Sequence, residues 1–395
     1  MIKRTTIIAI FLLLLPPAFS VTYAPHFPAL SVPGARAMGG PFVTDDDTAY
    51  CMITNPAIIS GVIHAGILPR ASATLSGPIA TFLSASSGEN VDQPLAKAIT
   101  SIVSTQGRLF MSADAVLPLN FGNIIQKDKV SFGWGVFNTV YGSIKMPSLI
   151  YGDVNVGFDV TGTYAMAFKI LKNELHLFSL GFSANLFVQV DAAHHGVPLD
   201  VLSFYWDIPT YLNVGLGVDF GLFYKYSNTF MLALVIDNAI VPTLSIPFTS
   251  GTILQFTPAG SMQFYLLPLN VKLGIGVDLP VEWGRKIISR WRVFVDVDNL
   301  VTQSADGSGK ILSTFMYMTD LNARHPLLCL SAGMQIKVYD VIDVRVGIKE
   351  MLPSIGVGFD LNPMLLDISI YGSELSNEIG GNPQGNVSVS LSFYY

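Results

Sequence analysis

The side chains that most often carry acid–base or metal chemistry are sparse in this chain of 395 residues, which has 6 His and 2 Cys. The one His cluster is His194-His195, with Asp191 and Asp200 nearby in sequence. No Gly-x-Ser-x-Gly nucleophile motif is present, and no Ser/His pair has a supporting spacing. No Cys/His spacing is typical of a metal site. The sequence therefore predicts that the protein is not an enzyme, with no catalytic residues, no metal ligands and no cofactor.

The two cysteines, Cys51 and Cys329, lie far apart in sequence and on different predicted elements. They could form a disulfide in an oxidising compartment, and two separate buried thiols are the favoured alternative. The sequence does not decide whether they pair.

An alternation of period two runs along most of the chain. In residues 154–170 the apolar side chains share one parity, and small or polar side chains hold the other. Successive side chains of a strand point to opposite faces, so each such segment has one apolar face. Half of the residues are hydrophobic and 13% are charged. After the first twenty residues no segment approaches the roughly 18–20 uncharged residues of a transmembrane helix.

A soluble sandwich could alternate in the same way, but two features favour a membrane barrel. Several segments exceed the soluble average of about five or six residues, as tilted spanning strands do. The final strand ends on an aromatic residue of the apolar parity, Tyr395. This ending resembles the C-terminal strand that the barrel assembly machinery of bacteria reads. We expect an all-β fold, a transmembrane antiparallel β-barrel.

The strand count is predicted to be about fourteen, an even number as in single-chain bacterial barrels. The expected strands are 63–75, 108–117, 130–141, 154–170, 174–190, 212–225, 228–239, 265–279, 290–300, 327–338, 341–349, 354–361, 364–372 and 386–395. Tight connections then fall on the periplasmic side, and the long connections 76–107, 191–211, 240–264, 301–326 and 373–385 fall outside. A short helix is expected at 92–103.

The N-terminus has the features of a cleaved signal peptide, residues 1–20. Lys3 and Arg4 precede an apolar run at 7–15, and Ala18-Phe19-Ser20 offers small residues for cleavage. Removing these two positive charges changes the net charge from −6 to −8. An acidic chain without a basic stripe is not expected to bind nucleic acid. Residues 21–62 show no strand pattern and form a separate N-terminal segment before the barrel at 63–395.

That segment carries a recognisable series of motifs. It runs from Pro33-Gly34-Ala35-Arg36-Ala37-Met38-Gly39-Gly40, through Asp45-Asp46-Asp47, to Asn55-Pro56-Ala57. In order and spacing over residues 31–60 it resembles the N-terminal signature of the FadL superfamily of outer-membrane long-chain fatty-acid transporters, and the chain is similar to FadL-like barrels of spirochaetes. The resemblance implies a barrel of fourteen strands whose N-terminal hatch, 21–62, folds into the lumen in the bacterial outer membrane. The hatch motif residues are Gly34, Gly39, Gly40, Asn55, Pro56 and Ala57.

The resemblance also implies passive uptake of hydrophobic small molecules, above all long-chain fatty acids, with sideways release into outer-membrane lipid. A sideways exit needs a broken strand. The best candidate is the third strand, with Gly133, Gly135 and a slip of parity at Phe137-Asn138. The alternative, that these glycines make room for the hatch, is at least as favoured. Some relatives with this signature serve instead as secretion or surface-anchoring scaffolds, which is the alternative function.

Candidate ligand contacts are of two kinds. Hatch residues Phe42, Tyr50, Met52 and Ile53 are predicted to form an apolar pocket wall, or equally to pack the plug. A fatty-acid carboxylate requires cations, and three lie on the polar parity of the strands: Lys272, Arg292 and Arg345. Aspartates share that parity, so internal ion pairs are the favoured explanation for most of these charges.

Overall fold

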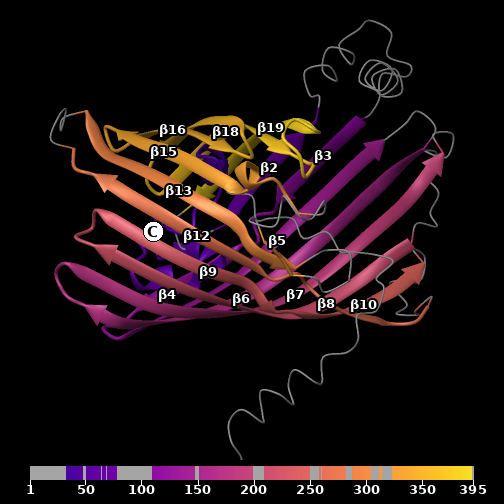
Figure 1. Ribbon diagram of the computed structural model, residues 1–395, viewed down its shortest axis with the longest axis horizontal. Helices are drawn as coiled ribbons and strands as arrows, with labels where there is room; N and C mark the ends of the chain where they lie inside the picture. Colours follow the sequence, from indigo (N-terminus) through magenta and orange to yellow (C-terminus); the bar gives the residue numbers. More distant parts are fainter. Residues whose placement is uncertain are drawn as a thin grey trace, which may run out of the picture.

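The computed structural model describes residues 33–47, 50–63, 65–67, 69–77, 109–146, 151–198, 209–249, 258, 260–281, 287–303, 311–313 and 323–393. Over these ranges the chain is an all-β protein, a closed antiparallel barrel with 14 strand positions (Figure 1). The predicted signal peptide and the helix expected at 92–103 lie outside the described residues. Among the residues described, no helix is both long and apolar enough to cross a bilayer.

The strands follow one another around the barrel almost in chain order. They are β1 (Gly66–Ile67), β2 (Arg70–Ser76), β3 (Leu109–Val116), β4 (Phe121–Gln126), β5 (Val130–Met146), β6 (Tyr151–Lys172), β7 (His176–Pro198), β8 (Pro209–Tyr226), β9 (Phe230–Ile240), β10 (Pro242–Thr249), β11 (Gln263–Leu266), β12 (Asn270–Leu279), β13 (Ile288–Gln303), β14 (Ile311–Ser313), β15 (Leu330–Val338), β16 (Ile342–Lys349), β17 (Leu352–Asp360), β18 (Met364–Glu374) and β19 (Pro383–Phe393).

Some strand positions are built from two of these segments. β3 and β4 both pair with β5, and β9 and β10 both pair with β8, so each pair occupies one position. β11 and β12 likewise share a position beside β10 and β9. The barrel closes where β19 pairs with β2, from Asn386 opposite Ser76 to Ser392 opposite Arg70. Closure leaves no free sheet edge in this ladder.

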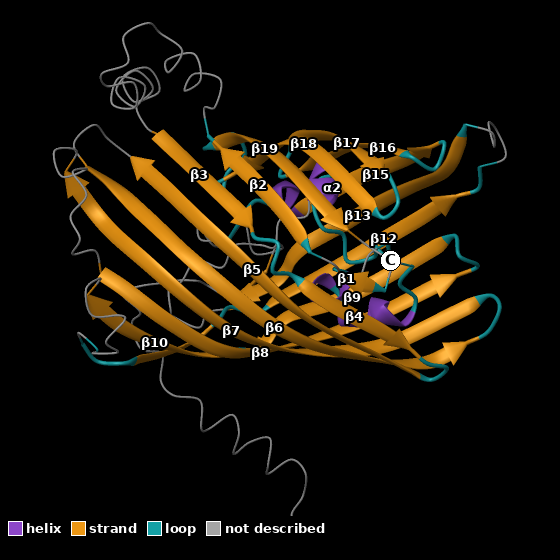
Figure 2. Cartoon of the chain, turned by 180° about the vertical axis from the view of Figure 1, so that it is seen from behind, coloured by secondary structure: helices purple, strands orange, loops and turns teal. Residues whose placement is uncertain are grey.

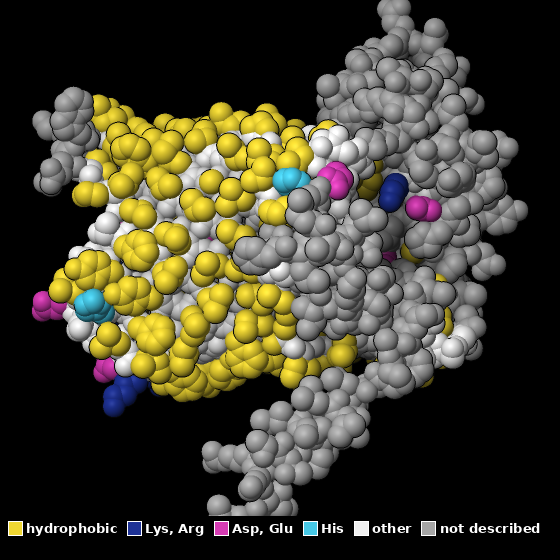
Figure 3. All heavy atoms as spheres, viewed as in Figure 1, with side chains coloured by type: hydrophobic (Ala, Val, Ile, Leu, Met, Phe, Trp, Pro, Cys, Tyr) yellow, Lys and Arg dark blue, Asp and Glu magenta, His cyan; other side chains and the backbone are white. Residues whose placement is uncertain are grey.

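The two faces of the wall differ as the alternation predicts. Outward side chains are apolar, and large ones such as Leu186, Phe220 and Ile355 are solvent-accessible on the isolated chain. Figure 3 shows hydrophobic side chains covering the visible outer face of the strands, with charged ones near its ends. Inward side chains are small or polar, and Ser183, Ser388 and many of their neighbours are buried. An apolar outer band around a polar interior is the pattern of outer-membrane barrels.

The N-terminal segment lies inside the barrel (Figure 2). It contains a one-turn helix α2 (Pro33–Ala37), a short helix α3 (Cys51–Thr54) and a 3-10 turn η1 (Pro56–Ser60). A further 3-10 turn, η5 (Pro326–Cys329), precedes β15. α2 contacts β16, β17 and β18, whereas η1 contacts β6, β7 and β8. The hatch thus reaches both sides of the lumen.

The fourteen predicted strands are confirmed, with corrections at their ends. β7 continues to Pro198, so the loop predicted to begin at residue 191 was wrong, and the backbone of His194-His195 is in a strand. The loop predicted at 240–264 contains β10, whose alternation is interrupted by Pro242 and Pro247. β4 was also missed. The two cysteines are separate buried thiols.

Candidate functional site

The geometry of the hatch is centred on Asn55, which is fully buried. Its side-chain amide donates to the carbonyl oxygens of Val43 at 3.0 Å and Leu222 at 3.3 Å, while its Oδ1 accepts from Ala57 N–H at 3.0 Å. Pro56 begins η1, where no backbone donor is needed. Asn55 therefore satisfies backbone groups in the hatch and in β8 at the same time.

The barrel wall makes room for this motif with a pair of glycines. Gly181 on β7 and Gly221 on β8 are directly opposite in register. A Cβ atom at Gly221 would overlap Asn55 Oδ1, and one at Gly181 would overlap the Ala57 backbone. The missing side chains form a slot into which the Asn55-Pro56-Ala57 turn fits.

A second glycine pair holds the other end of the hatch. Gly333 on β15 and Gly347 on β16 are register partners. A Cβ atom on either would overlap the carbonyl oxygen of Met38. The next residue, Gly39, has a φ of +99°, which a residue with a side chain rarely adopts. The hatch backbone therefore lies directly against the wall on both sides of the lumen.

Apolar side chains fill much of the space between these two slots. Phe42 is buried and stacks on Phe294 of β13, with ring centroids 5.1 Å apart, and Met52 is fully buried. Tyr50 and Ile53 pack against the edge of the same cluster. The predicted pocket-wall residues therefore lie together, and in this state they pack the plug.

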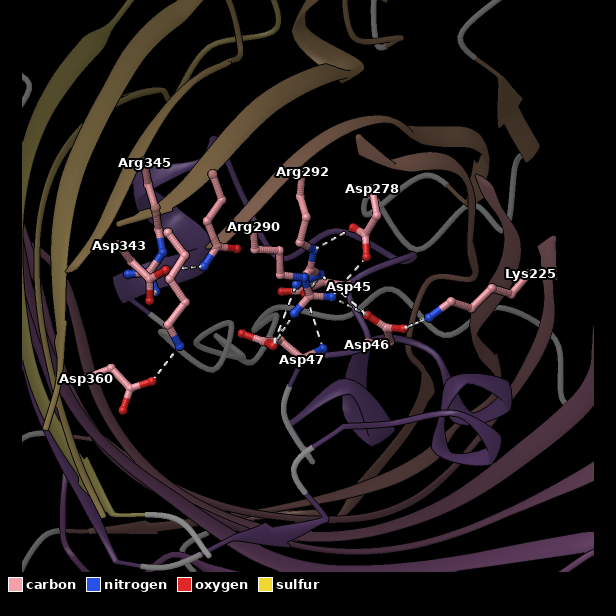
Figure 4. Close-up of polar contacts among 12 residues, drawn as sticks. Asp45, Asp46, Asp47, Lys225, Asp278, Arg290, Arg292, Asp343, Arg345 and Asp360 are labelled. Carbon is pink, nitrogen blue, oxygen red and sulfur yellow. Dashed lines mark hydrogen bonds and ion pairs between the residues drawn. The ribbon is translucent and has the colours of Figure 1, made fainter. Parts of the chain in front are cut away.

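The acidic segment of the hatch is held by cations of the wall (Figure 4). Asp46 lies 2.7 Å from Lys225 Nζ, Asp47 lies 3.0 Å from Arg290 Nη1, and Asp45 lies 2.5 Å from Arg292 Nη2. Arg292 is fully buried, and its Nε is also 3.2 Å from Asp278. Separating a buried ion pair leaves an uncompensated charge out of water, so these contacts favour the position of the hatch in which each aspartate meets its cation.

Burial changes the acid–base behaviour of the hatch. Desolvation raises the pKa of the Asp45 carboxyl above its ordinary value, and the Arg292 guanidinium opposes that rise. Burial also raises the pKa of the Cys51 thiol well above its usual range, with nearby aspartates adding to the effect. The docked thiol is therefore both covered and protonated.

The other two cations that were predicted to bind a ligand head group also form ion pairs with aspartates. Lys272 lies 2.5 Å from Asp237, and Arg345 pairs with Asp367 and with Asp343, the latter at 3.0 Å. Arg345 also touches Gly34 of the hatch, where a Cβ atom would come within 2.9 Å of its Nη1. The structure thus brings Arg292 and Arg345 to the hatch and places Lys272 in a wall ion pair.

The wall is broken beside the hatch. Residues 117–120 separate β3 from β4 and pair with no strand, so the ladder to β5 lapses between Val136 and Val140. On the other side, the described residues of the first two strand positions pair up to Ile67 and again from Ser72. The gap lies beside Phe137-Asn138, where the sequence predicted it, but the interrupted strand is the second position, because β5 itself pairs with β6 over its length.

One side chain bridges this break. Asn138 accepts from Leu117 N–H at 3.0 Å, and its side-chain amide donates to Asn120 Oδ1 at 2.7 Å. On the lumenal side, the ring of Tyr50 lies 5.8 Å from Phe137 and 5.0 Å from the Arg70 guanidinium. A hatch residue therefore stands directly behind the gap in the strand ladder.

Sequence reasoning missed the wall residues that receive the hatch. Gly181, Gly221, Gly333 and Gly347 look like ordinary members of the small parity, and Lys225 and Arg290 lie near predicted strand ends. A signal was present in retrospect: three consecutive aspartates in a lumenal segment require cations facing them.

Solved structures of known proteins share the fold of this chain. No family model matches the chain, and no curated protein matches its sequence. Among solved structures, the Pseudomonas putida toluene transporter TodX matches with a TM-score of 0.52 at 12% identity, covering 96% of this chain and 100% of TodX. The chain has a FadL-like fold.

A second solved structure has the same architecture. The CymD monoaromatic hydrocarbon channel matches with a TM-score of 0.50 at 12% identity, over 92% of this chain and 97% of CymD. At such low identity the likeness establishes the architecture of the barrel. It does not identify a ligand.

Proposed function

We propose that this FadL-like barrel is a passive channel of the bacterial outer membrane for hydrophobic small molecules. The observation that carries the proposal is an apolar plug, docked inside the lumen, directly beside a break in the wall. TodX and CymD, which share the architecture, are a toluene transporter and a monoaromatic hydrocarbon channel. Outer-membrane lipid surrounds the apolar band, and the C-terminal strand is the contact for the barrel assembly machinery.

The route that we propose ends at the break. Burying each CH₂ group is worth about 0.8 kcal/mol, so a long apolar molecule resists release into water. Sideways exit between β2 and the interrupted second position delivers it into the bilayer instead. Leu119 and Phe121 flank the break and face outward, with 61% and 48% of their surface exposed on the isolated chain. Movement of Tyr50 would open the path from the lumen.

A narrower proposal is that the transported molecules are long-chain fatty acids. Their carboxylate needs a cation in the lumen. Lys272, Arg292 and Arg345 would have to exchange an aspartate for the ligand, with Phe42, Tyr50, Met52 and Ile53 contacting the chain. Arg36 of α2 is the stronger candidate, because it makes no ion pair among the described residues. Its guanidinium lies 5.3 Å from the ring of Tyr371.

Uptake measurements test the proposal. The protein is produced in a Gram-negative host without its own FadL-type channel, and cells are given labelled toluene or labelled oleate. We expect faster toluene uptake than in cells with the empty vector. Oleate uptake that falls in Arg36→Gln supports the fatty-acid form. Folded protein in the outer membrane with no gain for either compound would refute the channel.

A further inference from the structure

A second polar cluster lies on the inner face of the wall, on strands β5, β7, β8 and β11. Four side chains from four strands form a hydrogen-bonded chain. Gln189 Nε2 on β7 donates to the Tyr141 hydroxyl on β5 at 2.8 Å. Asn213 Nδ2 on β8 donates to Gln189 Oε1 at 3.0 Å, and the Tyr265 hydroxyl on β11 donates to Asn213 Oδ1 at 3.4 Å. This network fixes the polar atoms of the inner surface.

Two carboxylates on the same surface have unused acceptors. Asp191 is fully buried, and neither of its oxygens has a hydrogen-bond partner within the described part of the chain. Asp159 accepts from Thr161 through one oxygen, and its other oxygen has no partner among the same residues. Asp159 is opposite Gln189 in register, two residues from Asp191, so both carboxylates face the lumen as diagonal neighbours.

Among the described side chains of the wall segments around these two carboxylates, none is a cation. The strand segments 137–143, 155–161, 185–193, 209–217, 242–249 and 263–266 contain no Lys, Arg or His. The hatch aspartates differ, because wall cations face each of them. A buried carboxylate without a donor is costly, so this wall is suited to a donor that arrives from outside.

Aromatic rings stand beside these carboxylates in fixed positions. Tyr141 lies over Gly157 and Phe187 lies over Gly215, so close that a Cβ atom at either glycine would overlap the ring. The face of an aromatic ring attracts cations, and a carboxylate accepts charge-assisted hydrogen bonds from them. Carboxylates, rings and fixed polar atoms together match the chemistry of an ammonium group.

We propose that Asp191 and Asp159 bind the protonated amine of an otherwise hydrophobic molecule in the outer part of the lumen. The inference rests on the proposed channel for hydrophobic molecules and not on fatty acids as its cargo. A carboxylate ligand would meet two further carboxyl groups here and no cation among the described residues, and it is therefore disfavoured.

Three water-soluble probes that share one aromatic ring and differ in charge test this preference for an ammonium group. They are benzylammonium, benzyl alcohol and benzoate. Their dissociation constants are measured by ligand-observed NMR on the full chain in lipid nanodiscs. We expect benzylammonium to bind at least about tenfold more tightly than either other probe, the factor for one hydrogen bond to a charged group. Asp191→Asn removes that preference, and Asp191→Glu restores part of it.

The matched control is Asp219→Asn. Asp219 is a buried lumenal carboxylate of β8, but Ser183 and Asn185 already donate to it, so the benzylammonium affinity should stay within about twofold. Equal binding of benzoate, or an unchanged benzylammonium affinity in Asp191→Asn, would overturn the inference. Toluene uptake by wild type and Asp191→Asn is measured in parallel: its absence in wild type refutes the channel, and its retention in the variant shows an intact barrel.

Discussion

Replacing Asn55 with alanine tests whether the hatch is held by its slot in the wall. The substitution removes the hydrogen bonds to Val43, Leu222 and Ala57, and it leaves their backbone groups buried without partners. The bond to Leu222 joins the hatch to the wall, and the bonds to Val43 and Ala57 hold the hatch in the shape that fits the slot. If the released hatch loses that shape, all three bonds count, and at about 1 kcal/mol for each of them docking should weaken by ~3 kcal/mol. That difference raises the population of the undocked hatch roughly 150-fold.

A native thiol reports this change directly. Cys51 lies in the hatch and is buried, so maleimide reacts with it only when the hatch leaves its place. Cys329→Ser removes the other thiol. If docking and release are fast relative to labelling, the labelling rate follows the undocked population, and Asn55→Ala should raise it by about two orders of magnitude. Circular dichroism of the β-sheet should not change.

The matched control is Thr54→Ala. Thr54 bonds only the carbonyl oxygen of Cys51, within its own helix, so its loss should change labelling less than about fivefold. If Asn55→Ala labels at the wild-type rate while the barrel remains folded, the slot does not hold the hatch and this account of docking is refuted.

Three further predictions use the same assays. Arg292→Met leaves the hatch aspartates without their buried cation and should loosen docking by about 3–5 kcal/mol; adding Asp45→Asn should slow thiol labelling again, and no recovery would contradict the ion-pair account. Gly221→Ala places a methyl group against the hatch amide and should speed labelling, whereas Gly162→Ala, with only a distant carbonyl nearby, should not. Asn138→Ala removes the bridge across the strand break and should increase toluene uptake, and unchanged uptake would exclude that bridge as a gate.

The strands were predictable because a wall with lipid on one face imposes a strict alternation of side chains. Residues 154–170 show it clearly, and β6 forms there. The alternation fails where a strand leaves the bilayer or breaks, and this is why β10 and the interruption at 117–120 were not expected. Prolines in those stretches remove the ladder donors that define a strand.

The candidate site was only partly predictable. The hatch motif and its acidic run identified Asn55 and the aspartates 45–47 as lumenal, but their partners depend on which strands face each other. Arg292 pairs with residues almost 250 positions earlier in the chain. The lack of a hydrogen-bond donor near the Asp191 carboxylate, among the described residues, also could not be predicted, because a sequence does not show which groups surround a side chain.

The seam between β19 and β2 has a consequence for the whole barrel. Seven residue pairs join these two strands. Without β19, the backbone groups of β2 and β18 would lie unpaired against hydrocarbon, where water cannot satisfy them. Loss of this one strand would therefore turn the closed barrel into an open sheet with two unpaired edges.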